Sequence, residues 1–339
     1  MSRNISLKDI ASKLGVSTAL VSYVLNNKKQ GRISKEVARK IRETAEALGY
    51  RKNFLATSLK TNKTHTIGLI VADISNAYFS NLARVIEDEA DRYGYTVIFG
   101  SSDEDLEKGR KLIDTFLSRQ VDGLIMASSG DSTDQVVALQ EAGIPFVLID
   151  RYFPNMKTNY VALDNYNAAL MATRHLLNEG CQRIGFVTYE HALFHMNERQ
   201  RGYESALNES NIEVDPALVK KVDYACVMED VTRSCQELLA GSKPVDGILF
   251  ASNKTAVYGL KYINSLSLKV PDDLAVVSFD ESDAFELFYA PVTHVRQPIQ
   301  QMGQKAAQIL IQTIEQETAI CQVTFPAEFV PGASSKRHS

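Results

Sequence analysis

The 339-residue chain contains no tryptophan, only 4 cysteines and no uninterrupted apolar run of 18 residues. The missing apolar run argues against a membrane-spanning helix. The N-terminus also lacks the apolar core of a signal peptide, so we expect a cytoplasmic protein without a membrane partner. The cysteines form no C-x-x-C pair, which favours a role as small buried side chains over a zinc or redox centre.

Motifs typical of several enzyme classes are missing as well. No G-x-G-x-x-G opens a helix after the first predicted strand, and the chain has neither a P-loop nor a G-x-S-x-G sequence. Its histidines show no metal-ligand spacing on one helix; those considered are His175, His191, His195 and His294. We therefore expect no catalytic residues, no metal and no cofactor.

Residues 6–30 predict two short amphipathic helices separated by a tight turn at Gly15. Ser17 is suited to cap the second helix, whose inward stripe is Val21, Val24 and Leu25. A short, uncharged, hydrogen-bonding face remains outward, which suits insertion into the major groove of DNA. An ordinary helical hairpin is the alternative, because helix–turn–helix spacing is common. The outward residues are Thr18, Ala19, Ser22, Tyr23 and Asn26.

Two further features favour DNA binding. A third helix is predicted after Ser34, with apolar residues spaced to close a three-helix core. Residues 1–63 carry 14 of the chain's 37 Lys and Arg but only 4 of its 41 Asp and Glu. The remainder is acidic, so the charge pattern indicates a small polyanion-binding head on an acidic body.

From residue 65 the hydrophobic period changes to short apolar runs that alternate with helical stretches. The first four runs are residues 66–72, 96–100, 123–128 and 146–150, and a second series includes 160–164, 183–189, 218–224, 247–252 and 275–280. This alternation predicts two doubly wound α/β subdomains with parallel sheets. The fold class expected for the chain is thus a small all-α helix–turn–helix head plus an α/β body.

Polar residues follow several predicted strands, including Asp73, Asp150-Arg151, Asn253-Lys254 and Asp280. Each one alone is readily explained as the N-cap of the next helix. Ligands of doubly wound folds, however, bind beyond the carboxyl ends of the strands. Convergence of these side chains on one cleft therefore predicts a ligand site between the lobes.

The sequence resembles the lac repressor/gal repressor family of bacterial transcription regulators from about residue 5 to about residue 330. The resemblance is carried by LKDIASKLGVSTALVSYVLNN, ISKEVARKIRETAEALGYRKN and LATSLKTNKTHTIGLIVADISNAYFS. It implies a DNA-binding head (1–50), a hinge (51–64), a periplasmic-binding-protein-like body (65–330) and a tail (331–339). It places an N-subdomain at about 65–162 and 293–321, and a C-subdomain at about 163–292 and 322–330.

By this resemblance, the hinge forms a short helix on DNA, where Leu59 is the wedge inserted through the minor groove and Lys60 contacts the backbone or the groove nearby. A plain tether is the alternative, because an isolated segment of this length is too short for a stable helix. The complete set of expected DNA contacts is Ser17, Thr18, Ala19, Leu20, Ser22, Tyr23, Asn26, Arg32, Leu59 and Lys60. Leu20 and Tyr23 depart from the family pattern, so the operator should differ from those of relatives.

The resemblance also places an effector site between the two lobes. Tyr78 and Phe79 match its aromatic pair. Arg199 matches an arginine that binds ring hydroxyls or a carboxylate, and Asp280 matches an acidic residue that binds a hydroxyl pair or a ring nitrogen. Lys254 departs from the usual Asp, which suggests an anionic effector such as a sugar acid or sugar phosphate. Alternatively, Lys254 turns outward or pairs with a carboxylate such as Asp280. The expected effector residues are Asp73, Tyr78, Phe79, Asp150, Arg151, Arg199, Asn253, Lys254 and Asp280.

The sequence thus predicts a homodimeric transcriptional regulator, expected to be a repressor, that binds a near-palindromic double-stranded operator and a small sugar-like effector. A leucine heptad for tetramer formation is absent from the C-terminus. Three other interpretations stay open: control by a protein co-effector, a pure solute-binding protein, and a sugar- or nucleotide-converting enzyme. The basic head disfavours the second, and the missing catalytic motifs disfavour the third.

Overall fold

The computed structural model describes residues 5–26, 32–50, 63–130, 132–190, 193–315 and 319–337. The described chain divides into two compact units, a head up to residue 64 and a body from residue 65 onward. Each unit is considered by itself below. The predicted hinge, with Leu59 and Lys60, lies outside the described residues except for its last two positions.

The head contains the three predicted helices, α1 (Leu7–Leu14), α2 (Thr18–Leu25) and α3 (Lys35–Ala47). Local chemistry defines their ends. Gly15 closes α1 with a left-handed backbone (φ 64°), a conformation that glycine adopts without steric cost. The hydroxyls of Ser17 and Ser34 accept hydrogen bonds from the first turns of α2 and α3. A small apolar core joins the helices; its buried members are Ile10, Ala11, Val21, Val24, Ile41 and Ala45.

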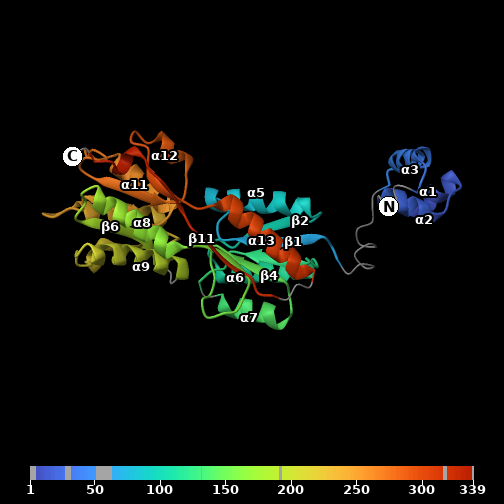
Figure 1. The fold of residues 1–339 in the computed structure, drawn as a ribbon, viewed down its shortest axis with the longest axis horizontal. Helices are drawn as coiled ribbons and strands as arrows, with labels where there is room; N and C mark the ends of the chain where they lie inside the picture. The colour runs from blue at the N-terminus through green and yellow to red at the C-terminus, as the bar shows by residue number, and fades with distance from the viewer. Residues whose placement is uncertain are drawn as a thin grey trace. The chain divides into compact units, whose positions relative to one another are not determined.

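The body consists of two lobes, each built on a six-stranded sheet (Figure 1). The first-lobe sheet is parallel throughout and has the order β11-β5-β4-β3-β1-β2. The second-lobe sheet has the order β12-β10-β9-β8-β6-β7, in which only the edge strand β12 is antiparallel. These sheets confirm the predicted pair of doubly wound subdomains.

All nine predicted body strands are present. They are β1 (Thr66–Val71), β2 (Thr96–Ser101), β3 (Gly123–Met126), β4 (Phe146–Ile149), β5 (Tyr160–Leu163), β6 (Ile184–Tyr189), β7 (Val219–Val222), β8 (Gly247–Phe250) and β9 (Ala275–Phe279). Three short strands were not predicted: β10 (Thr293–Arg296), β11 (Gln322–Phe325) and β12 (Glu328–Val330).

Helices cover both faces of the first-lobe sheet. The helices of this lobe are α5 (Ala77–Arg92), α6 (Leu106–Ser118), α7 (Thr133–Glu141) and α13 (Ile299–Ile314). On β1, Ile67 and Leu69 pack with α5 and α13, whereas Ile70 packs with Ile113 of α6 and Val136 of α7. Because successive strand residues point to opposite faces, one apolar strand supplies two cores.

The second lobe is organised around one large apolar core. Its helices are α8 (Asn165–Asn178), α9 (Phe194–Glu209), α10 (Val227–Leu239), α11 (Asn253–Ile263) and α12 (Asp283–Leu287). Helix α8 packs against α9, and α10 packs against α11. Cys181 and Cys235 are buried in this core as predicted, but Cys226 is exposed and Cys321 is half-buried.

The chain crosses between the lobes three times, a few residues later than expected at two of the crossings. Strand β10 pairs with β9 in the second lobe, so Thr293–Arg296 does not belong to the first lobe. Strand β11 pairs with β5 in the first lobe, so Gln322–Phe325 does not belong to the second. These strands are short and mixed in polarity, so hydrophobic period alone did not identify them.

Residues assigned to a C-terminal tail are part of the second lobe as far as residue 337. The 3₁₀ turn η2 (Ala333–Ser335) buries Ser334 and Ser335. The Ser334 hydroxyl donates to the carbonyl of Val276, and His175 bonds to Ser335 through Nε2 (2.7 Å). Within the described ranges, no helix is long and apolar enough to cross a membrane.

The close packing of α8 and α9 gives a test of the second lobe. A Cβ at Gly202 on α9 would lie 2.2 Å from the carbonyl oxygen of Tyr166 on α8. Gly202→Ala should therefore force the helices apart and lower the free energy of unfolding by about 2–3 kcal/mol. Gly109→Ala on α6 is the control, because its nearest atoms are 3.8 Å away. Urea unfolding followed by circular dichroism measures both; equal midpoints would contradict the packing described.

Candidate functional site

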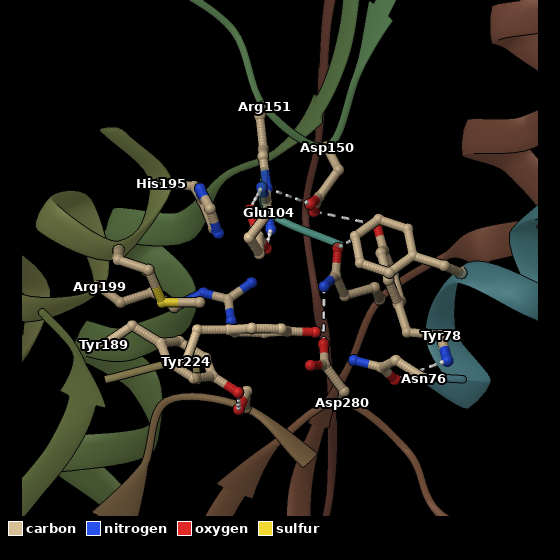
Figure 2. A pocket seen from close by; sticks show the side chains of 14 residues that line it. Asn76, Tyr78, Glu104, Asp150, Arg151, Tyr189, His195, Arg199, Tyr224 and Asp280 are labelled. Carbon is tan, nitrogen blue, oxygen red and sulfur yellow. Dashed lines mark hydrogen bonds and ion pairs between the residues drawn. The ribbon is translucent and has the colours of Figure 1, made fainter. Parts of the chain in front are cut away.

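A cleft lies in the body where the carboxyl ends of both sheets meet (Figure 2). It holds about 400 Å³ of space, including its solvent-filled mouth. Both lobes contribute to its wall, as expected for ligands of doubly wound folds. The side chains that line it are Asn76, Tyr78, Phe79, Glu104, Asp150, Arg151, Tyr189, His195, Met196, Arg199, Tyr224, Ser252, Asp280 and Gln297.

Two buried aspartates stand directly after the central strands of the two sheets. Asp150 follows β4 and Asp280 follows β9, each with a left-handed backbone, at φ 66° and 65°. Such strained positions are uncommon for residues other than glycine and are concentrated at functional sites. Burial raises the pKa of Asp150, and the neighbouring charges of Arg151 and Arg199 oppose this shift.

Tyr78 and Gln297 connect the two aspartates. The Tyr78 hydroxyl donates to Asp150 Oδ1 (3.0 Å) and lies 3.3 Å from Gln297 Oε1. The Gln297 amide in turn donates to Asp280 Oδ1 (2.7 Å). Tyr78 is held at the start of α5 because Asn76 caps that helix. Burial, and then the negative charge of Asp150, raises the pKa of Tyr78 far above 10, so its hydroxyl remains a donor.

Arg199 is held rigidly in the wall of the second lobe. Its side chain is among the largest fully buried ones, at 2% exposure. Nε donates to Asn165 Oδ1 (2.7 Å), and Nη1 donates to the carbonyl oxygen of Ala251 (2.6 Å). The guanidinium also stacks 4.1 Å above the centre of the Phe279 ring. These contacts fix the direction of its remaining donors toward a ligand.

Arg151 is held by the opposite wall, and its charge has a direct partner. Both terminal nitrogens donate to the carboxylate of Glu104, over 2.6 and 2.5 Å. Its Nε lies 3.5 Å from Asp150 Oδ2. The guanidinium also faces Phe79, with the ring centre 5.8 Å away.

His195 and Met196, from the first turn of α9, complete the wall of the second lobe. Burial, together with the positive charges of Arg151 and Arg199, lowers the pKa of His195 well below 6.5. The imidazole is therefore neutral at physiological pH. Its buried Nδ1 has no hydrogen-bond partner among the residues that the structure describes.

Lys254 does not line the cleft, and its contacts do not support the expected role in binding an anionic effector. Its Nζ lies 3.0 Å from Asp73 Oδ2 and 4.3 Å from the centre of the Tyr224 ring. The Tyr224 hydroxyl also donates to Asp73. The alternative of pairing with a carboxylate is the arrangement found, although the partner is Asp73 of the first lobe rather than Asp280.

Asn253 forms a second polar bridge between the lobes, since its amide donates to Asn76 Oδ1 (2.9 Å). Of the predicted effector residues, the cleft thus brings together Tyr78, Phe79, Asp150, Arg151, Arg199 and Asp280. Asp73, Asn253 and Lys254 are not among the residues that line the cleft: Asp73 pairs with Lys254, and Asn253 bonds to Asn76.

Eight residues of the lining are not among the expected effector residues. The strand-end argument points to three of them, Asn76, Tyr189 and Ser252, and it could have found Glu104 after β2. Gln297 lies between β10 and α13, where the chain crosses between the lobes. The remaining three, for which the sequence carried no clear signal, are His195, Met196 and Tyr224.

In the head, the expected DNA contacts fall into two groups. Ser17, Thr18, Ala19 and Arg32 are exposed, while Ser22, Tyr23 and Asn26 are half-buried. Leu20 packs against the apolar core of the head, which limits what it can offer to DNA. Within the described part of the chain, no group of three or more metal-ligating side chains occurs.

Two parts of the chain match known protein families. Residues 6–53 match the family described as bacterial regulatory proteins, lacI family, and residues 173–335 match a periplasmic binding protein-like domain. The chain is 32% identical over 312 residues to the ribose operon repressor of Halalkalibacterium halodurans, covering 92% of this chain and 91% of that protein.

Two solved structures are also similar. A LacI family regulator from Enterococcus faecium with bound ribose aligns at a TM-score of 0.71 and 27% identity, covering 80% of this chain and 98% of that one. The lac repressor dimer bound to operator and the anti-inducer ONPF aligns at a TM-score of 0.85 and 20% identity, covering 98% and 99%. At 20% identity the second likeness concerns the fold alone.

The bridge at Asp73 predicts a pH-dependent stability. Burial raises the pKa of Asp73, but hydrogen bonds from Ser75, Tyr224 and Lys254 outweigh it and lower the pKa to about 2. The stabilisation is therefore present above about pH 4 and is lost as the pH falls toward 2. Asp73→Asn should cost about 1–2 kcal/mol at pH 7 and progressively less below pH 4.

Thermal unfolding of the unsubstituted chain and of Asp73→Asn between pH 7 and pH 2.5 measures the difference in their stability. Asp114→Asn, at an exposed position on α6, is the control and should show no such dependence. A penalty for Asp73→Asn that stays constant over this range would contradict the assignment.

Proposed function

The chain belongs to the lacI family of bacterial regulatory proteins, and we propose that it is a homodimeric repressor controlled by an uncharged sugar. The head binds operator DNA, and the sugar binds in the cleft between the lobes. The observation that carries the effector class is the make-up of the cleft wall: fixed aspartates and arginines, with a buried imidazole nitrogen that lacks a partner among the described residues.

The polar groups of the cleft suit the hydroxyls of a sugar ring. Asp280 and Arg199 are fixed by Gln297, Asn165 and the backbone, so each presents paired hydrogen-bonding atoms with a set geometry. Tyr78 and Phe79 supply apolar surface for the carbons of the ring. The similarity to a ribose operon repressor and to a ribose-bound regulator supports a pentose of this kind.

The charge balance favours an uncharged sugar over the sugar acids and phosphates suggested by Lys254. The lining contains three carboxylates, on Glu104, Asp150 and Asp280, against two guanidiniums. His195 adds no positive charge because its pKa is lowered. An anionic ligand would therefore enter a wall with an excess of negative charge, where desolvation of its own charge has no compensation.

On the DNA side, we assign base reading to α2, whose exposed start carries Ser17, Thr18 and Ala19. Tyr23 lies one helical turn after Ala19 and extends this reading surface. Arg32 is a phosphate contact. Leu59 and Lys60 keep their proposed roles as wedge and groove contact at the centre of a near-palindromic operator, where the two heads of a dimer meet.

The sugar acts on DNA affinity only through a difference in its affinity for the DNA-bound and free forms. The cleft provides the means, because its wall is drawn from both lobes and a bound sugar changes the energy of their relative arrangement. The relatives named above are regulators, which disfavours an enzyme.

A ligand panel tests the effector class. The full chain is heated with D-ribose, other neutral sugars, ribonate or ribose 5-phosphate. A neutral sugar at a hundred times its dissociation constant should stabilise the chain by about 2.7 kcal/mol. Asp280→Asn should lower the affinity for that sugar about 10- to 100-fold, because a charged hydrogen bond is lost. Asp114→Asn is the control. A shift confined to acids and phosphates would overturn the neutral-sugar proposal.

Selection of bound sequences from a random DNA pool tests the assignment of the head. Tyr23→Ala should relax the preference at one base position in each half-site, at a cost of about 1–3 kcal/mol. Arg32→Ala should weaken binding to all DNA sequences equally. It should also reduce the salt dependence of the DNA affinity by the contribution of about one phosphate contact. If Arg32→Ala changed the selected sequence and Tyr23→Ala did not, the proposed orientation of the head would be wrong.

A further inference from the structure

The contact between Glu104 and Arg151 is unusual for an ion pair in this chain because it is buried. The two side chains are only 10% and 9% exposed, and they meet through two parallel hydrogen bonds of 2.5 and 2.6 Å. A comparable pair on the surface, Arg110 with Glu107, leaves more than half of each side chain exposed. A buried pair needs such complete geometry, because desolvation of both charges is costly.

Glu104 reaches the cleft from a strained loop between β2 and α6. Asp103 and Glu104 both have left-handed backbones, with φ values of 53° and 60°. Two consecutive residues of this kind are uncommon outside glycine, because the side chain makes this backbone conformation strained. The Asp103 carboxylate accepts hydrogen bonds from Ser101 and Lys108, which hold the turn. The loop thus directs the Glu104 carboxylate inward, onto the guanidinium of Arg151.

The two arginines of the cleft differ in the kind of group to which they donate hydrogen bonds. Arg199 donates to neutral oxygens, those of the Asn165 amide and the Ala251 carbonyl. Arg151 instead places its whole guanidinium fork on a carboxylate. That fork is the geometry with which arginine binds the carboxylate or phosphate of a ligand. Glu104 therefore occupies the site that an anionic ligand would need.

We propose that Glu104 is a specificity-determining residue that masks Arg151 and so makes the cleft reject anionic sugars. This inference rests on the proposed sugar-binding function and adds the residue that sets the charge class of the ligand. Removal of the carboxylate would leave two guanidinium groups facing two carboxylates and would free two donors of Arg151. The cleft would then accept a sugar acid or sugar phosphate.

The test compares the full chain with its Glu104→Gln variant by calorimetric titration with D-ribose, ribonate and ribose 5-phosphate. Glu104→Gln keeps the size of the side chain and removes its charge. We expect the ratio of anion affinity to ribose affinity to rise at least tenfold in the variant. Glu107→Gln, in the first turn of α6 on the surface, is the matched control and should leave this ratio unchanged. Circular dichroism verifies that each variant is folded.

Two further variants keep the test decisive. In a Glu104→Gln chain, the added change Arg151→Met should abolish the gain in anion affinity, because the freed guanidinium is its source. If Glu104→Gln does not fold, Glu104→Ser removes the same charge and leaves space in place of an amide facing the guanidinium.

The outcomes separate this inference from the proposed function. If the folded Glu104 variants gain no anion affinity, the masking role is overturned, whatever the wild-type chain binds. If Arg151→Met leaves the gain intact, masking is likewise overturned. If the wild-type chain binds none of the neutral sugars, the neutral-sugar effector fails, while a gain of anion affinity in Glu104→Gln would still support the masking role.

Discussion

The feature on which the rest of the structure depends is the direction of the strands. Apart from one antiparallel edge strand, both sheets are parallel, and their carboxyl ends meet at one cleft. The central parallel strands are buried on both faces and are mostly apolar, so their charged side chains lie at the points where these strands end. Asp150 and Asp280 are there for this reason, one from each lobe, and the ligand site follows from the fold.

Burial then dictates how the polar groups are arranged. A charge taken out of water needs a partner or must be neutralised, and the cleft shows both solutions. Arg151 is paired with Glu104, whereas Arg199 donates to an amide and a carbonyl oxygen and stacks on an aromatic ring. His195 is neutral because its pKa is lowered. The chemistry offered to a ligand is what remains after this internal pairing. A cleft rich in ionisable residues can therefore be suited to an uncharged molecule.

This internal pairing explains how far the sequence could predict the site. The period of the hydrophobic residues was sufficient to predict the nine main strands and the helices of the head. The positions of the strand ends were sufficient to predict the two aspartates. They say nothing about which charged side chains meet, since that depends on side-chain direction across two lobes. Lys254 follows a strand end just as Asp280 does, yet it pairs with Asp73 outside the cleft. Glu104 depends on a left-handed turn that no local motif indicates.

The two kinds of contact between the lobes also suggest how a ligand and the protein share control of the body. The Asp73–Lys254 pair and the Asn76–Asn253 hydrogen bond join the lobes without any ligand, and Asn76 is the one of these four residues that also lines the cleft. The sugar that we propose for the cleft would add contacts of its own to both walls. These contacts would add to the interactions that already join the lobes. Under the proposed function, substitutions at Asp73, Lys254 or Asn253 would change the sensitivity to the effector, whereas residues of the cleft wall would decide which sugar binds.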